Sequence, residues 1–221
     1  MDDTLLDQLI DRLPDCANIL ARDKYHNYAV LVPLIFIDGE YHLVFEKRSP
    51  SISQGSEVCF PGGMHDTTID KNCRETAVRE TVEELGIPEN KIRVLGRFDT
   101  LVASTGATVD AFLGLLDITG INELAANRSE VENVFTLPVS FFMNAQPESY
   151  QVRLMVEPSY IDKHGKEIIL FPAKELGLPE AYHTPWGKTF HRVLVYKTDK
   201  ETVWGITAEI INDMISKLKK E

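Results

Sequence analysis

Three glutamates, Glu80, Glu83 and Glu84, lie close together in a segment that we expect to be helical. Residues three and four positions apart share one face of an α-helix, so these carboxylates should meet within one turn. Crowded carboxylates repel each other, and hard oxygen donors favour Mg or Mn over zinc. Because the segment follows a glycine turn at Gly62 and Gly63, the arrangement predicts a metal centre that hydrolyses phosphate esters or anhydrides.

A solvated acidic face is the alternative interpretation of this helix. Glu75, Arg79 and Glu83 are spaced four apart and fit ordinary surface ion pairs. Two features favour the metal centre. Apolar residues recur at i, i+4 and i+7 and give the helix a separate core face: Val78, Val82 and Leu85. Gly86 stands where a C-cap glycine belongs, so the acids crowd the last turn, where negative charge opposes the helix dipole.

The same segment resembles the signature of the Nudix hydrolases, G-x5-E-x7-R-E-U-x-E-E-x-G-U, in which U is a bulky apolar residue. The matching residues are Arg79, Glu80, Glu83, Glu84, Gly86 and Ile87, with Gly63 as the opening glycine. Lys71 replaces the early glutamate of the signature, and Asp70 is the nearest acid. Thr81 stands where an aliphatic residue is usual, and the interval from Gly63 to Arg79 is one residue longer than in the general signature.

A narrower resemblance, to the coenzyme A pyrophosphatase branch of these enzymes, covers roughly residues 30–215. Its matching segments are 45–49, 57–63, 76–80, 130–131, 134–138 and 204–208. The branch usually has an arginine soon after its Arg-Ser pair and a glycine directly before its Glu-Val pair. Here residues 50–54 contain no arginine, and Ser56 precedes Glu57. Because basic side chains would bind the 3'-phosphate of coenzyme A, this departure leaves the substrate open.

The resemblance implies roles for individual residues. Glu80 and Glu84 would be the strongest metal ligands, joined by Glu83 and a backbone carbonyl near Gly62. Arg79 would orient Glu83, and Glu130 would act as a base or ligand, unless it belongs to a plain exposed turn. The residues expected to contact substrate are Arg48, Gly63 and Phe60. Asp66 and Asp70 fit either water-mediated metal contacts or turn and cap chemistry.

The hydrophobic pattern predicts an α+β protein. Strands are expected over 28–37, 41–45, 91–102, 108–116, 133–137 and 190–196, with a hairpin formed by 150–156 and 167–171. Helices are expected over 4–13, 72–85, 140–143 and 206–218, with Asp70 as the N-cap of the second. This order resembles the Nudix α/β/α sandwich with a mixed sheet. We expect one domain over 1–221, with the signature region at 62–87.

Composition limits the possible partners. The net charge of −11 disfavours nucleic acid and anionic membranes, whereas a bound cation would still admit a small anionic substrate. The three cysteines, Cys16, Cys59 and Cys73, are irregularly spaced, which is typical of a reducing compartment. The sequence shows neither a signal peptide pattern nor an apolar run of transmembrane length. We therefore expect a cytoplasmic protein, and a homodimer is compatible with the sequence.

Together these features predict an enzyme that uses Mg or Mn to hydrolyse a diphosphate bond in a nucleotide. The resemblance points to coenzyme A or a derivative, which would give 3',5'-ADP and a 4'-phosphopantetheine fragment. NADH, ADP-ribose or a sugar nucleotide is the alternative substrate. A Nudix-fold nucleotide sensor without catalysis is the alternative function. Lys71 and the incomplete coenzyme A motif favour the sensor, and the retained glutamates favour the enzyme.

Overall fold

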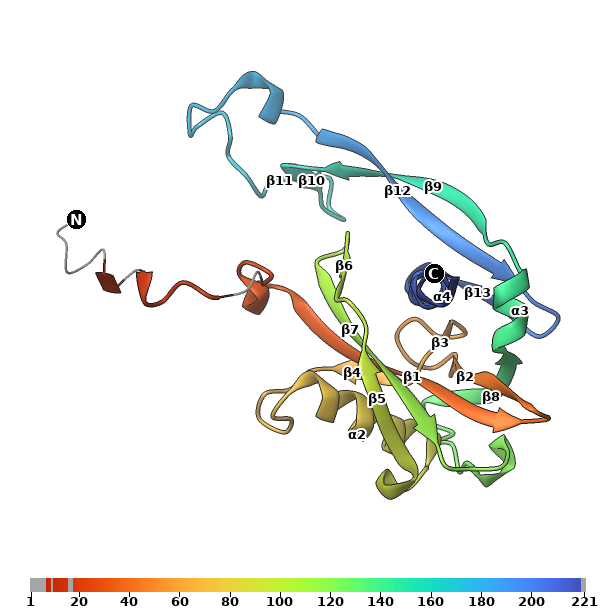
Figure 1. Ribbon diagram of the computed structural model, residues 1–221. Helices are drawn as coiled ribbons and strands as arrows, with labels where there is room; N and C mark the ends of the chain where they lie inside the picture. Colours follow the sequence, from red (N-terminus) through yellow and green to blue (C-terminus); the bar gives the residue numbers. More distant parts are fainter. Residues whose placement is uncertain (1–6, 9, 16–17, 220–221) are drawn as a thin grey trace.

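The computed structural model describes residues 7–8, 10–15 and 18–219. Within these residues the centre is an eight-stranded sheet of main order β3-β2-β1-β7-β5, with β4 and β6 added beside β1 and β7, and β8 beside β2 (Figure 1). Its strands are β1 (His26–Ile37), β2 (Glu40–Arg48), β3 (Val58–Cys59), β4 (Gly62–Met64), β5 (Ile92–Arg97), β6 (Leu101–Ala103), β7 (Ala107–Leu116) and β8 (Val131–Pro138). β1 is parallel to β7 and antiparallel to β2 and β4, so the sheet is mixed, as expected.

A hairpin turn at Asp38 and Gly39 joins the first two strands, which agrees with the strands predicted over 28–37 and 41–45. Both residues have positive φ angles, 52° and 87°, which match the twist of the flanking strands in a two-residue turn. The turn pairs Ile37 with Glu40 and so sets the register of β1 against β2. Because side chains alternate along a strand, this register sends Val44 to one face of the sheet and Phe45 to the other.

One helical layer covers each face of the sheet, as the α/β/α prediction required. Helix α2 (Cys73–Leu85) packs on the face that carries Val44, with Ala77 and Leu85 in that core. Helix α4 (Gly205–Lys219) packs on the face that carries Phe45, together with the short helix α3 (Val139–Asn144). Figure 1 shows α2 and α4 on opposite sides of the sheet. The core on the Val44 face therefore fixes the position of α2 against the sheet.

The signature helix differs from expectation at its start and on its buried face. Asn72, not Asp70, is the N-cap, because its side chain accepts a 3.1 Å hydrogen bond from the Glu75 amide. The predicted core face of Val78, Val82 and Leu85 is wrong for its first two members, which are only partly buried. The fully buried positions of the helix are Thr76, Ala77, Thr81, Glu84 and Leu85. The buried face of the helix is therefore rotated relative to the predicted face, and Glu84 points toward the sheet. Gly86 is the left-handed C-cap, as predicted.

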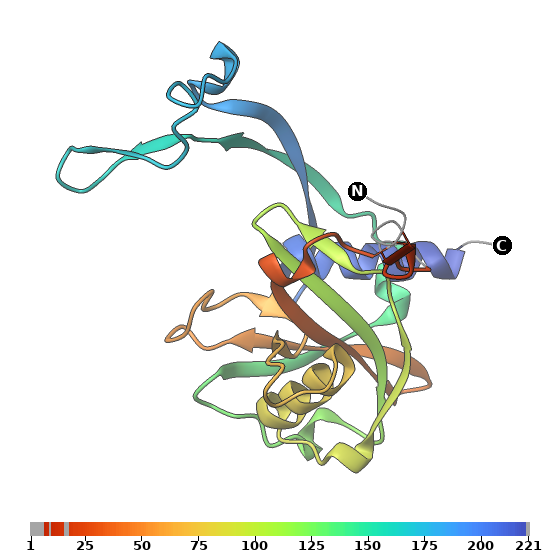
Figure 2. The ribbon, with the colours of Figure 1, turned by 90° about the vertical axis from the view of Figure 1, so that its left-hand side faces the viewer.

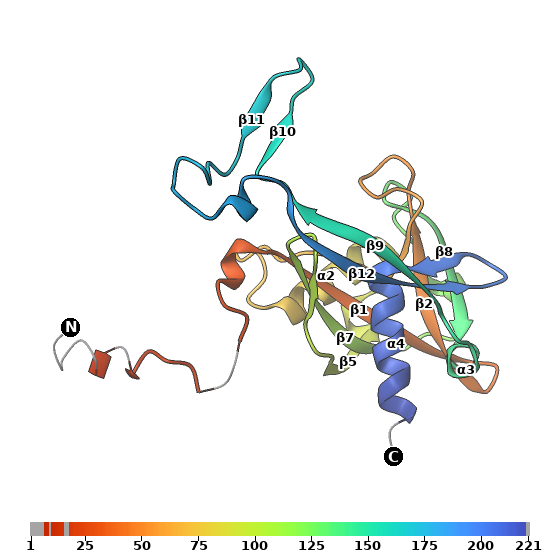
Figure 3. The same ribbon diagram turned by 90° about the horizontal axis from the view of Figure 1, so that it is seen from above.

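The second half of the chain builds a separate three-stranded sheet of order β13-β12-β9. Its strands are β9 (Glu148–Val156), β12 (Trp186–Lys197) and β13 (Thr202–Trp204). The predicted hairpin between 150–156 and 167–171 is wrong, because β9 pairs with β12, while β10 (Ser159–Ile161) pairs with β11 (Glu167–Ile169). Residues 148–197, called the arm below, pass over α4 and then extend beyond the rest of the molecule (Figures 2 and 3).

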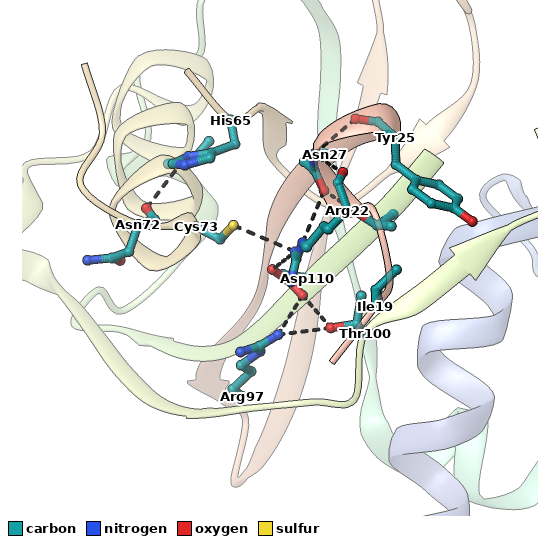
Figure 4. Close-up of polar contacts among 12 residues, drawn as sticks. Ile19, Arg22, Tyr25, Asn27, His65, Asn72, Cys73, Arg97, Thr100 and Asp110 are labelled. Atoms are coloured by element: carbon teal, nitrogen blue, oxygen red, sulfur yellow. Dashed lines mark hydrogen bonds and ion pairs between the residues drawn. The ribbon is translucent and has the colours of Figure 1, made fainter. Parts of the chain in front are cut away.

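Asp110, in the middle of the apolar strand β7, joins segments that are distant in the chain (Figure 4). It is paired with Arg22 of the 3-10 helix η1 (Arg22–Lys24) and with Arg97 of β5, the latter at 2.8 Å. Thr100 also donates a hydrogen bond of 2.6 Å to it. Burial favours the neutral carboxyl, but the hydrogen bonds from Thr100, Cys73 and Arg22 hold the pKa of Asp110 below its ordinary value. The buried charge is therefore compensated.

The remaining short helices are η2 (Glu89–Lys91), η3 (Ile121–Glu123) and η4 (Glu180–Tyr182). The helix expected over 4–13 falls partly on residues that are not described and stays a prediction, and Cys16 also lies outside the described residues. Over the part of the chain that is described, no helix is both long and apolar enough to cross a membrane.

Candidate functional site

The glycine turn holds the carboxylate of Glu84 against the backbone. The amide of Gly62 donates a 2.8 Å hydrogen bond to Oε2 of Glu84. Gly62 sits in β4, paired with Val30 of β1, and a Cβ there would lie 2.3 Å from the carbonyl oxygen of Ala29. Only glycine allows this strand to approach β1 so closely. Glycine is therefore required at this position because three elements, β1, β4 and α2, approach one another closely here.

Gly63 performs the same role for Glu80. A Cβ at Gly63 would lie 2.4 Å from the carboxyl carbon of Glu80 and 2.4 Å from its Oε1. The Glu80 carboxylate thus rests directly on the backbone of the glycine turn, one helical turn away from Glu84. The glycine turn therefore contacts, through two neighbouring residues, both acids that we expect to be the strongest metal ligands.

Glu84 is enclosed by protein and by other charges. Only 4% of the residue is exposed, because it belongs to the buried face of α2. Burial and the nearby Glu46 carboxylate raise its pKa, since both disfavour a second negative charge in this place. Arg48, expected to contact substrate, has its Nη1 4.0 Å from Oε1 of Glu84. The structure thus brings Arg48 to the acidic site.

Glu46 is a site residue that the sequence reasoning missed. It follows Val44 by two positions on β2, so it lies on the sheet face covered by α2, and only 1% of it is exposed. Cys59 donates a 3.3 Å hydrogen bond to Oε1, while Oε2 has no partner among the described residues. Burial raises the pKa of Glu46. An acid within the apolar run of residues 43–46 was the available signal.

Arg79 is held by three acids. Its Nε and Nη2 each donate a 3.0 Å hydrogen bond to Asp70, forming a bidentate pair with a carboxylate that is nearly inaccessible. Its Nη1 lies 2.8 Å from Oε1 of Glu80 and 3.1 Å from Oε2 of Glu83. Arg79 lowers the pKa of Asp70. Asp70 therefore anchors the arginine, and the arginine orients both glutamates.

The other predicted residues divide into those near the acids and those apart from them. Glu83 is 53% exposed at its side chain and turns toward Arg79, away from the buried Glu84. Glu130 lies close enough to raise the pKa values of Glu46 and Glu80. Phe60 is a core residue, 3% exposed and stacked on Phe45 with ring centroids 5.1 Å apart, so its side chain supports the loop from within.

Asp66 makes the turn contacts that were one of its two expected roles. Its carboxylate accepts hydrogen bonds from the amide and hydroxyl of Thr68, at 2.8 and 2.6 Å. These bonds lower its pKa. Asp66 thereby shapes the loop that leads from the glycine turn into α2.

The donor set was tested for its fit to a divalent cation. Across the described residues, no three His, Cys, Asp or Glu side chains already converge on one cation position, and Glu80 is engaged with Arg79. Two observations nevertheless fit a hard cation: the unpartnered buried oxygen Oε2 of Glu46, and carboxylates of Glu80 and Glu84 pressed against a backbone turn. All of these donors are oxygens, which suit Mg or Mn.

A family model of the NUDIX domain matches residues 26–153, which is more than half of the chain. This chain belongs to the NUDIX family. The match includes the glycine turn, α2 and Glu130, so the site described above lies within the Nudix domain. The chain is a Nudix hydrolase with the mixed-sheet α+β fold of that family, as its signature indicated. Members of this family generally use divalent metal ions.

The chain is similar to several known Nudix proteins. The uncharacterized Nudix hydrolase NudL of Photorhabdus laumondii is 29% identical over 198 residues, covering 89% of this chain and 87% of that protein. The peroxisomal coenzyme A diphosphatase NUDT7 of Mus musculus is 34% identical over 122 residues, which are 55% of this chain and 50% of the mouse protein. Among solved structures, the NUDIX domain of Shewanella oneidensis NrtR complexed with ADP ribose is 16% identical, with a TM-score of 0.43, covering 66% of this chain and 89% of that chain.

Proposed function

We propose that this protein hydrolyses the diphosphate bond of a nucleotide with Mg or Mn, and that coenzyme A or a derivative is its substrate. The observation that carries the proposal is the pair of carboxylates, Glu80 and Glu84, held against the backbone of Gly63 and Gly62. Two carboxyl groups already held against the turn are preorganised, so little rearrangement opposes the binding of a cation.

In this proposal Glu80, Glu84 and the backbone carbonyl of Gly62 hold the cation, with Glu46 and Glu83 adding negative charge. When bound, a divalent cation supplies positive charge to diphosphate oxygens and lowers the pKa of a water molecule. Arg79 keeps Glu80 and Glu83 in place through its anchor on Asp70.

Two further residues complete the proposed chemistry. Glu130, close to the other acids, accepts a proton from the attacking water or supplies a further oxygen to the cation. Arg48, whose Nη1 lies 4.0 Å from Oε1 of Glu84, contacts a substrate phosphate, for which a guanidinium is suited.

The choice of coenzyme A rests on the relatives and on the matching segments of the chain. Mouse NUDT7 is named a coenzyme A diphosphatase, and so is human NUDT8, 34% identical over 143 residues. The segment 50–54 lacks the arginine that the branch usually carries, so the 3'-phosphate must be bound by other groups. NADH and ADP-ribose, which lack this phosphate, are the competing substrates.

The test is a hydrolysis panel with Mg or Mn: coenzyme A, its acyl thioesters, NADH, ADP-ribose and nucleoside triphosphates, with products identified by mass spectrometry. Release of 3',5'-ADP and a phosphopantetheine fragment is expected. Faster turnover of another compound would keep the metal chemistry and move the specificity. If the protein binds metal but hydrolyses none of these compounds, the proposal is wrong.

A further inference from the structure

The arm, residues 148–197, exposes an apolar surface that one chain leaves uncovered. Among the described residues, 25 large hydrophobic side chains are exposed, and 11 of them lie in this arm of fifty residues. They are Tyr150, Val152, Val156, Tyr160, Ile161, Ile169, Leu170, Phe171, Leu176, Tyr182 and Phe190. Most of the arm lies beyond the residues matched to the NUDIX domain. Exposed apolar side chains gathered in one segment are typical of an interaction site.

The two faces of the β9–β12 ribbon differ. Leu194 and Tyr196 of β12 are buried, and Arg192 binds Glu209 of α4 at 2.7 Å, so their shared face is turned toward α4. The other face carries the residues of opposite parity. On β9 these are Glu148, Tyr150, Val152, Leu154 and Val156, and on β12 they are Thr189, His191, Val193, Val195 and Lys197. Glu148 and Lys197 form an ion pair of 2.8 Å at one end of this face, and we call the other eight residues the outer face.

The outer face has the alternating apolar pattern of a strand face that is usually buried. Apolar side chains alternate at Tyr150, Val152, Leu154 and Val156, which normally indicates a half-buried strand. Yet Tyr150 is 51%, Val152 46% and Val156 49% exposed. Beyond the Glu148–Lys197 pair at its end, the outer face contains no Lys, Arg, Asp or Glu, although these make up 26% of the chain. Depletion of charge is typical of the centre of a protein interface.

Charge distribution favours a second copy of the chain as the occupant. The arm holds seven Lys and Arg against six Asp and Glu, net +1, whereas the chain as a whole carries −11, so the rest carries −12. Two copies that approach through their bodies bring like charges together. Two copies that approach through their arms avoid that repulsion. The outer edge of β9 also has no strand partner among the described residues, and an edge of this kind favours pairing with another chain.

We propose that two copies of this chain form a two-fold dimer in which the outer faces of their arms pack together. An isologous contact uses the same patch on both copies, which an uncharged apolar face allows. It also supplies the packing that an isolated two-stranded ribbon needs for stability. The proposal is independent of the substrate.

Sedimentation equilibrium of the full chain, from nanomolar to high micromolar concentration, tests the dimer. The wild-type protein should dimerise, and Val152→Asp should raise the dimer dissociation constant by at least about tenfold, because it puts a charge at the centre of the contact. Leu95→Asp, on β5 and 48% exposed, is the matched control and should dimerise normally. Phe190→Asp, on the opposite face of the same ribbon, should also dimerise normally.

Circular dichroism of each variant confirms that the fold is intact, since all three positions are exposed. Hydrogen exchange supplies a second measurement: amides of β9 and β12 should become more protected as protein concentration rises. A monomeric wild type, or a Val152→Asp variant that dimerises normally, would overturn the proposal. If the protein stays monomeric and the arm amides become protected only when nucleotide is added, the arm covers the active site of its own chain. That result would also overturn the dimer proposal.

Discussion

Glu84 illustrates how a single charge is placed for chemistry. On a free helix it would sit in water, but here it is buried, receives one amide hydrogen bond from Gly62, and faces Glu46. The cost of burying a carboxylate beside another acid is large unless a cation compensates it. We therefore propose that this position serves metal binding at the expense of the stability of the free protein.

Glu84→Gln should reduce turnover by at least about a hundredfold while leaving the fold intact, because the amide keeps the shape and the hydrogen bond from Gly62 but loses the charge. Turnover and circular dichroism of the two proteins are compared. Glu75→Gln, in the first turn of the same helix, is the control and should retain activity. Near-normal turnover of Glu84→Gln would refute the metal assignment.

Glu46→Gln tests the residue that only the structure revealed. If its buried, unpartnered oxygen contributes charge to the cation, the variant should bind Mn about tenfold more weakly, measured by titration calorimetry. Glu40→Gln, at the other end of β2, should bind Mn as the wild type does. Equal affinities for the wild-type protein and Glu46→Gln would show that Glu46 takes no part.

At the scale of elements, the site is the junction of β4 with α2. The turn can approach the helix only because Gly62 and Gly63 lack a Cβ. Ala77, Thr81 and Leu85 pack the helix against the sheet, which fixes the distance between turn and helix. The positions of the acidic residues thus follow from packing between elements, rather than from the helix alone.

Gly63→Ala should displace the Glu80 carboxylate, because the added methyl group would lie 2.4 Å from it. We expect metal affinity and turnover to fall by about tenfold or more, with little loss of secondary structure. Gly96→Ala is the matched control on a strand, since a Cβ there meets nothing within 4 Å. An active Gly63→Ala enzyme with normal metal affinity would mean that Glu80 tolerates displacement.

At the scale of the whole molecule, Asp110 connects η1, β5 and β7 through one buried carboxylate. Its pKa in the folded protein is below the unfolded value, so its contribution to stability is complete above the unfolded pKa. That contribution is lost as pH falls through the folded pKa. The relevant window is below about pH 4.

Asp110→Asn should lower the free energy of unfolding at neutral pH by about 2 kcal/mol, since Arg22 and Arg97 lose their charged partner. The difference in the free energy of unfolding between this variant and the wild type should become smaller as pH falls below the unfolded pKa of Asp110. Urea unfolding at several pH values measures both effects. Asp117→Asn, at an exposed position, should behave as wild type, and a constant difference at every pH would contradict the linkage.

The sequence by itself determined the family, the signature helix and the order of most strands. These depend on local spacing: Arg79, Glu80, Glu84 and Gly86 are fixed by the helical period and the C-cap, and the Asp38 turn by backbone preference. The assignment of all 221 residues to one domain stays a prediction.

Only the tertiary structure decided the rest. Which face of α2 is buried depends on the sheet that it meets, so Glu84 is enclosed while Glu83 is exposed. Glu46 and Asp110 look like isolated acids in apolar strands until distant partners surround them. The pairing of β9 with β12 joins residues too far apart for local patterns to reveal, because strand partners are selected by packing across the whole chain.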